Sequence, residues 1–240
     1  MITQYLLPDS AEQAVAELAG NAAVLGGGTL VMPAAHAGAL DAERVVGLAR
    51  AGLAGIERDG GRITIGAMTP LAAVAELEGA VGRAAAAVGG PALRNLATVG
   101  GNLLAGAPYG DVGVALLALD AEVRLSARTI PLAELWETFD PAGEIIVSVA
   151  FEDDPDSVFV RWARRAANSP AVVCVAVSRG RVALGGVAPH PVRSPGAEAG
   201  DPAAAAREID PPTDAIASAW YRRRMTELFV RRALEASHAV

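Results

Sequence analysis

The sequence predicts an α+β fold, because helical and strand patterns are mixed along the chain without an internal repeat. The first 50 residues predict a helix followed by a βαβ-like unit. Residues 62–66 and 121–125 alternate between apolar and other side chains, a pattern typical of half-buried strands. Residues 220–236 instead place apolar side chains at helical spacing.

Local signals justify each element near the N-terminus. Ser10 precedes Gln13 by three residues, the spacing of a capping box, so a helix begins there. Residues 22–25 predict a short buried strand, residues 30–37 a helix, and residues 44–48 a second strand.

Turn residues bound the elements that follow. Residues 59–61, Asp-Gly-Gly, predict a hairpin turn into the strand at 62–66. Residues 71–87 predict one or two helices, broken near Gly79 and Gly82. The later expected elements are strands at 145–151, 158–162, 172–178 and 181–187, a tight turn at Arg179-Gly180, and a loop at 195–202.

The acidic segment 152–156, which contains a proline, is the expected domain boundary. A first domain would span residues 1–152, with subdomains of about 1–50 and 51–152. A second domain would span residues 157–240.

Composition excludes several classes of function. With 20 basic and 27 acidic residues the net charge is −7, which argues against a nucleic-acid groove as the main binding surface. Every basic residue is Arg, so no lysine-based mechanism is available. One cysteine (Cys174, expected in the core) and three histidines (His36, His190 and His238) provide no zinc or iron–sulfur ligand set. The Arg run 222–224 is expected on a solvated helix face.

Targeting and membrane signals are absent from the sequence pattern. The longest aliphatic run, residues 112–119, is far shorter than the roughly 20 residues that span a bilayer. The first residues have no basic region followed by an apolar stretch. We therefore expect a cytoplasmic protein without membrane insertion.

Two glycine-rich segments are the most informative feature. The first glycine segment is residues 26–29 (GGGT) and the second is residues 98–102 (TVGGN). Successive glycines let the backbone approach a ligand and present N–H groups to a phosphate. One such segment is typical of an ordinary turn, whereas two suit a diphosphate held from both sides. Neither matches a Rossmann or P-loop motif.

These segments resemble those of the FAD-binding (medium) subunits of the molybdenum hydroxylases, the carbon monoxide dehydrogenase and xanthine dehydrogenase family. Residues 26–33 (GGGTLVMP) are similar to the family's A-G-G-[TH]-[DS]-L-L-P. Residues 94–111 are similar to its R-N-x-[GA]-T-[IV]-G-G-[ND]-x-x-x-[AG]-x-P-x-x-D. Shorter likenesses lie at 65–69, 143–146, 187–189, 221–225 and 230–234, so the resemblance covers nearly the whole chain.

The resemblance implies a fold and a cofactor. The fold would be the FAD-binding fold of p-cresol methylhydroxylase and vanillyl-alcohol oxidase in two subdomains, with a small α+β C-terminal domain. The cofactor would be FAD, bound without a covalent link. No catalytic or metal-binding residue is expected on this chain. The expected FAD contacts are Leu25, Gly26, Gly27, Gly28, Thr29, Leu30, Thr98, Gly100, Gly101, Asn102 and Asp111.

The implied function is electron transfer within a molybdenum-containing hydroxylase. The chain would take electrons from a small subunit with [2Fe–2S] clusters and pass them to an external acceptor. A large subunit would carry the molybdenum cofactor. Two alternatives stay open: a stand-alone FAD reductase resembling UDP-N-acetylenolpyruvoylglucosamine reductase, and a flavin-free structural subunit.

The chain departs from the family pattern at several places. Leu30 replaces a polar residue, and a glycine-containing loop is missing between Leu135 and Thr138. Asn168 replaces a residue that is commonly acidic in the family, whereas Arg161 and Arg165 keep the basic residues that members often carry there.

Overall fold

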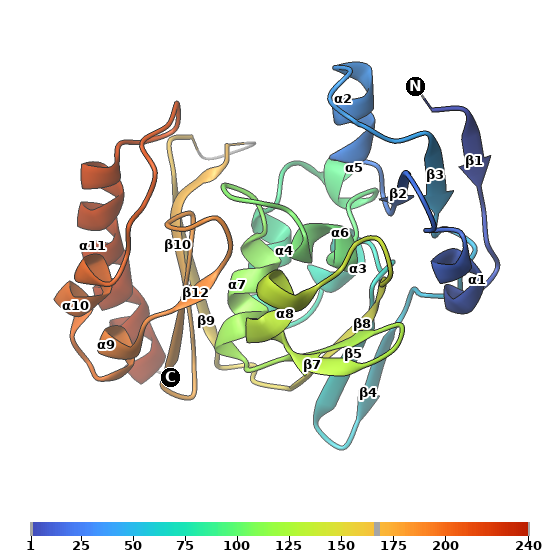
Figure 1. Cartoon of the computed structure of the whole chain (residues 1–240). Coiled ribbons are helices and arrows are strands. Elements are labelled where there is room, and N and C mark those ends of the chain that lie inside the picture. The colour runs from blue at the N-terminus through green and yellow to red at the C-terminus, as the bar shows by residue number, and fades with distance from the viewer. Residues whose placement is uncertain (1, 166–168, 240) are drawn as a thin grey trace.

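The computed structural model describes residues 2–165 and 169–239, and three β-sheets lie within those ranges (Figure 1). The N-terminal sheet has the strand order β1-β3-β2, and the central sheet β4-β5-β8-β6-β7. The C-terminal sheet has the order β12-β11-β10-β9. This mixture of sheets and helices confirms the α+β class. Asn168 lies outside the described residues.

The N-terminal sheet contains the expected βαβ unit. Its elements are β1 (Gln4–Leu6), α1 (Ala11–Ala16), β2 (Ala22–Leu25), α2 (Val31–His36) and β3 (Arg44–Gly47). Both β1 and β2 pair with β3 in parallel. The Ser10 hydroxyl accepts a hydrogen bond from the Gln13 N–H at 3.2 Å, so the predicted helix start is confirmed.

The central sheet is antiparallel throughout. Its strands are β4 (Ile56–Asp59), β5 (Arg62–Gly66), β6 (Glu122–Leu125), β7 (Thr129–Pro131) and β8 (Ile146–Glu152). Gly60 and Gly61 both have positive φ between β4 and β5, which confirms the predicted hairpin.

Short helices connect the strands of this sheet. They are α3 (Leu71–Val74), α4 (Gly79–Ala87), α5 (Pro91–Arg94), α6 (Val99–Leu103), α7 (Asp111–Ala118) and α8 (Leu132–Thr138). The break predicted at Gly79 is confirmed, whereas the break predicted at Gly82 is wrong because Gly82 lies inside α4. A Cβ at Gly82 would lie 1.7 Å from the Leu77 carbonyl oxygen, so glycine there permits a close approach.

The C-terminal region packs a sheet against one long helix (Figure 1). Its elements are β9 (Val158–Ala163), β10 (Ala171–Ser178), β11 (Arg181–Gly185), β12 (Val192–Arg193), α9 (Pro195–Glu198), α10 (Pro202–Arg207) and α11 (Ala219–His238). The loop predicted at 195–202 is wrong, because α9 and the start of α10 occupy it. Ser194 and Asp201 cap these helices, and a proline follows each cap.

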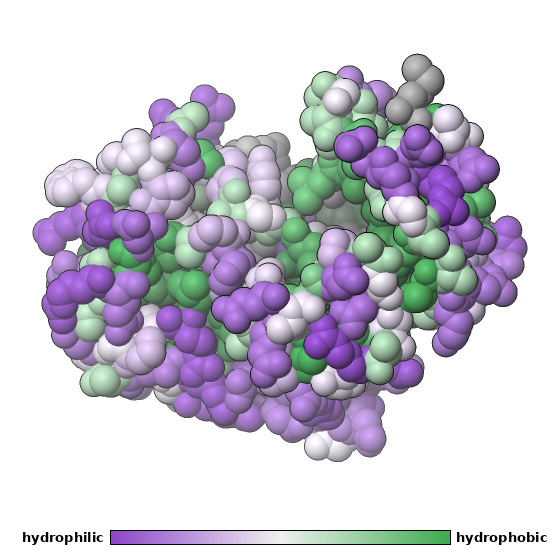
Figure 2. Space-filling model, in the orientation of Figure 1, coloured by the Kyte–Doolittle hydropathy of each residue, from purple (hydrophilic) through white to green (hydrophobic). Residues whose placement is uncertain are grey.

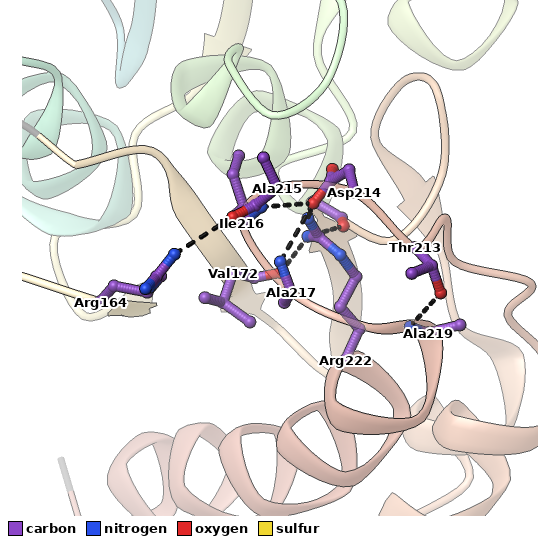
Figure 3. A network of polar contacts seen from close by, with 10 residues as sticks. Arg164, Val172, Thr213, Asp214, Ala215, Ile216, Ala217, Ala219 and Arg222 are labelled. Carbon is purple, nitrogen blue, oxygen red and sulfur yellow. Dashed lines mark hydrogen bonds and ion pairs between the residues drawn. The ribbon is translucent and has the colours of Figure 1, made fainter.

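The expected solvent-facing Arg run is wrong for Arg222, which is only 1% exposed. Its guanidinium binds both carboxylate oxygens of Asp214 at 2.9 Å (Figure 3). It also donates to the carbonyl oxygens of Val172 and Gly186, each at 2.6 Å. Arg222 begins the buried stripe of α11, which continues through Thr226, Phe229, Val230 and Ala233.

Strand β10 is buried on both faces. Ala171, Cys174 and Ala176 belong to the same apolar cluster as α7 and the central sheet. Val173 and Val175 pack with α11 in a second cluster. Cys174 is therefore a core residue, as predicted. None of the helices described is long and apolar enough to cross a membrane.

Candidate cofactor-binding site

A cleft of about 880 Å³ opens beside the N-terminal sheet and reaches the C-terminal sheet. This volume lies in the range typical of small-molecule and cofactor sites, roughly 300–1,000 Å³. Every sequence-predicted contact except Leu25 lines it: Gly26, Gly27, Gly28, Thr29, Leu30, Thr98, Gly100, Gly101, Asn102 and Asp111. Leu25 is half-buried at the end of β2, next to the cleft-lining Gly26.

The two glycine segments are brought into contact by the fold. A Cβ on Gly27 would lie 1.6 Å from the Leu96 carbonyl oxygen, and one on Gly26 would lie 2.9 Å from Thr98 Oγ1. Side chains at these positions would therefore push the segments apart. Residues far apart in the sequence thus form one continuous wall of the cleft.

The first glycine segment keeps its backbone donors available. No hydrogen bond between described residues uses the N–H groups of residues 26–31. Leu30 occupies the N-cap position of α2 and makes no side-chain hydrogen bond to the helix. These N–H groups at the cleft wall fit the oxygens of an anionic group such as a diphosphate.

Most backbone N–H groups of the second glycine segment donate to other groups of the protein. The N–H groups of Val99 and Gly100 donate to the carbonyl oxygens of Thr69 and Ala67, at 3.1 and 2.8 Å. The Thr98 hydroxyl caps α6 by accepting from the Gly101 N–H at 3.3 Å. The N–H groups of Gly100 and Gly101 are therefore engaged within the protein, and these two glycines offer surface rather than free N–H groups to a ligand.

Asp111 forms a buried polar cluster with two residues of the C-terminal sheet. Its carboxylate lies 3.2 Å from Arg161 Nε and accepts a hydrogen bond from the Cys174 thiol at 3.5 Å. Burial raises the pKa of Asp111, while the charge of Arg161 acts in the opposite direction. Burial also raises the pKa of the Cys174 thiol well above its usual range, so this thiol stays protonated.

A second charged pair lies at another part of the cleft. Arg128 binds the two Glu144 oxygens at 2.8 and 3.1 Å and also donates to the Thr138 carbonyl. The Arg128 guanidinium lowers the pKa of Glu144. The region of the missing family loop, between Leu135 and Thr138, lies in the C-terminal half of α8.

Sequence reasoning missed much of the lining, including parts of residues 88–93, 104–110 and 139–146. The turn residues at 89–91 and 108–110 were the available signal. Exposed apolar side chains gather here, and Figure 2 shows apolar surface beside a hollow below α2. The large exposed apolar residues of the lining are Leu30, Leu93, Leu104 and Tyr109.

The comparison with protein families decides the identity of this fold. The family model described as the FAD binding domain in molybdopterin dehydrogenase matches residues 1–151. The chain belongs to this family. The resemblance read from the motifs is thereby confirmed, and with it the expectation of an FAD-binding oxidoreductase component.

Solved structures resemble this FAD-binding chain over its whole length. Carbon monoxide dehydrogenase from Hydrogenophaga pseudoflava, in a form that lacks the Mo-pyranopterin moiety, is 26% identical with a TM-score of 0.90. The alignment covers 100% of this chain and 98% of that one. Quinoline 2-oxidoreductase from Pseudomonas putida 86 shares the fold, with 23% identity, a TM-score of 0.85 and the same coverage. Among the curated proteins, none matches this chain.

The cleft fits the cofactor of the family. The free N–H groups of residues 26–31 suit phosphate oxygens, and the glycines leave room for close approach. The buried Asp111 supplies an acceptor for a hydroxyl group. Within residues 2–165 and 169–239, no three His, Cys, Asp or Glu side chains are grouped so that they could hold a metal ion.

Proposed function

We propose that this chain is the FAD-carrying electron-transfer subunit of a molybdenum-containing hydroxylase. It takes electrons from a [2Fe–2S] subunit and passes them to an external acceptor. The observation that carries the proposal is the row of N–H groups at 26–31, which donate to no other described residue and lie in the cleft of a chain of this family. The same row counts against a flavin-free structural subunit.

In this proposal each cleft residue has a binding role. The first glycine segment donates its N–H groups to the diphosphate, flanked by Leu25 and Leu30. Residues Thr98, Gly100, Gly101 and Asn102 form the wall against which the cofactor packs. Asp111 accepts a hydrogen bond from a cofactor hydroxyl. Bound FAD would accept electrons and release them again, while the chain binds and orients it.

The proposal extends to the layout of the chain. The sheet of residues 1–50 and the sheet of residues 51–152 correspond to the two subdomains of a p-cresol methylhydroxylase-type FAD domain. Residues 157–240 correspond to the C-terminal domain. The packing of α7 against β10 supports a close contact between these domains.

Partner subunits complete the proposed electron path. The single cysteine of this chain cannot supply the ligands of a [2Fe–2S] cluster, which needs four. We therefore assign the clusters to a small subunit and the molybdenum cofactor to a large subunit, in a cytoplasmic complex.

Rapid mixing tests this function. The FAD-loaded chain is mixed without oxygen with the chemically reduced [2Fe–2S] protein that co-purifies with it, and the flavin absorbance is followed. We expect the flavin to bleach on mixing, while an aldehyde, a purine or carbon monoxide leaves the isolated loaded chain oxidised. Turnover of such a substrate by the isolated chain, or an unreduced flavin in the assembled complex, would contradict the proposal.

A further inference from the structure

Two aromatic rings from distant parts of the sequence stack beside the cleft. Trp136 of α8 and His190, between β11 and β12, have ring centroids 5.3 Å apart and planes only 2° from parallel. Both side chains are half-buried, and neither lines the cleft. The stack therefore joins the central region to the C-terminal region outside the cofactor site.

The stack is attached to residues 103–110, here named the connecting segment, which comprise the last residue of α6 and the chain that links it to α7. The Trp136 Nε1–H donates to the Leu103 carbonyl at 2.8 Å, and the Ala107 N–H donates to the Pro189 carbonyl at 3.0 Å. Among the described residues, these are the non-local hydrogen bonds of the connecting segment; its others stay within residues 99–113.

The connecting segment is itself a wall of the cleft. It lies between the second glycine segment and Asp111, the first residue of α7. Its cleft-lining residues are Leu104, Ala105, Pro108, Tyr109 and Gly110. A shift of this segment would therefore change the space between two groups of proposed FAD contacts.

Helix α7 leaves room for the stack at one position. A Cβ on Gly113 would lie 3.3 Å from Pro191 Cγ and 3.5 Å from Trp136 Cζ2. Glycine at this position lets Pro191, which follows His190, and the Trp136 indole both pack against the helix. The stack, α7 and the connecting segment are thus in direct contact.

We propose that Trp136 and His190 are positioning residues, whose stack fixes the connecting segment and thereby sets the affinity of the cleft for FAD. The inference rests on the proposed function only in taking FAD as the ligand. The indole N–H satisfies the Leu103 carbonyl at the end of α6, and the stack holds the indole in place. From the C-terminal region, the Pro189 carbonyl holds the connecting segment through Ala107, and the His190 ring holds the Trp136 indole.

Paired variants test this role. Trp136→Phe removes the indole N–H, and His190→Ala removes the stack, while neither change touches the cleft lining. We expect each to weaken FAD binding about 5-fold, the effect of losing one hydrogen bond or aromatic contact. His190→Phe keeps a stacked ring and should bind FAD within about twofold of the wild type.

Trp162 offers a matched control. Its Nε1–H donates to the Tyr221 hydroxyl at 3.0 Å, and its ring packs on Phe229 at 5.7 Å, away from the cleft. Trp162→Phe thus removes the same kind of bond without reaching the connecting segment. We expect it to lower the Tm of the apoprotein as much as Trp136→Phe does, with an unchanged Kd for FAD.

The readouts are the Kd of FAD from titration calorimetry, the visible circular dichroism of the bound flavin, and the Tm of the apoprotein. An unchanged Kd and flavin spectrum in Trp136→Phe and His190→Ala would overturn the inference alone. Equal weakening of FAD binding by Trp162→Phe would also overturn it, as a general stability effect. A wild-type chain that binds no FAD would overturn the proposed function and this inference together.

Discussion

The carbonyl oxygen of Leu96 packs so closely on Gly27 that a Cβ at this glycine would lie 1.6 Å from it. This contact holds the first glycine segment against the residues that lead into the second one before any ligand is present. Gly27 is thus required by the packing of the protein, in addition to any need of the cofactor. Replacing Gly27 therefore tests whether this contact is needed to form the wall of the cleft.

Gly27→Ala should abolish FAD binding and destabilise the protein by about 1–3 kcal/mol, the usual cost of overpacking. The added methyl group must push residues 96–98 away from the first glycine segment. Urea unfolding and FAD titration measure the two effects. Gly106→Ala is the control, because a Cβ there meets nothing within 4 Å. Wild-type stability and FAD binding in Gly27→Ala would contradict this account of the cleft.

Asp111→Asn should separate stability from cofactor binding. Burial raises the folded-state pKa of Asp111, so its ionisation costs stability as the pH rises from its ordinary value through the raised one. At pH 7 the asparagine variant should therefore be at least as stable as the wild type. FAD affinity should fall about tenfold, because a charged acceptor is lost.

Urea unfolding of both proteins at pH values from about 4 to 8, above the ordinary Asp pKa of about 3.9, checks the sign of the stability change. FAD titration checks the affinity. The exposed Asp120→Asn serves as the control for both measurements. A large loss of stability at pH 7 in Asp111→Asn alone would show that the Arg161 ion pair outweighs the burial of the carboxyl group.

Leu30 offers a gain-of-binding prediction. Leu30→Ser places a hydroxyl group beside the free N–H groups of residues 26–31, where it can donate to a phosphate oxygen. We expect about fivefold tighter FAD binding at low salt. Leu30→Ala, which removes the leucine side chain without adding a hydroxyl group, should instead leave FAD binding close to that of the wild type. Equal affinities of both variants would refute the placement of the diphosphate at the first glycine segment.

Asp214 and Asp210 each pair with an arginine of α11, but we expect their removal to cost different amounts of unfolding free energy. Asp214→Ala leaves the buried Arg222 guanidinium without its anion and should cost about 3 kcal/mol of unfolding free energy. Asp210→Ala removes the partner of the more exposed Arg223 and should cost less than about 1 kcal/mol. Similar losses in both variants, measured by urea unfolding, would contradict the structural role of Arg222.

Local signals explain what could be predicted from the sequence. The Ser10 cap, the Gly60-Gly61 turn and the Arg179-Gly180 turn each depend on a few adjacent residues, and the structure contains all three. The two glycine segments were likewise visible as short motifs. Their meeting in one cleft was expected only from the family resemblance.

Contacts between distant residues explain what was missed. The internal use of the Gly100 N–H depends on the Ala67 carbonyl, which no local pattern reveals. The burial of Arg222 depends on carbonyl groups of two strands, although its place in the α11 stripe was a usable signal. The caps at Ser194 and Asp201 were also readable, since a proline follows each of them.

The central claim is that this cleft binds FAD without a covalent link. Its most direct measurement is the visible spectrum of the purified chain after incubation with excess FAD and gel filtration, repeated after acid precipitation. We predict a flavin spectrum in the native fraction and free FAD in the acid supernatant. A colourless native fraction, or flavin that stays with the precipitated protein, would contradict the account.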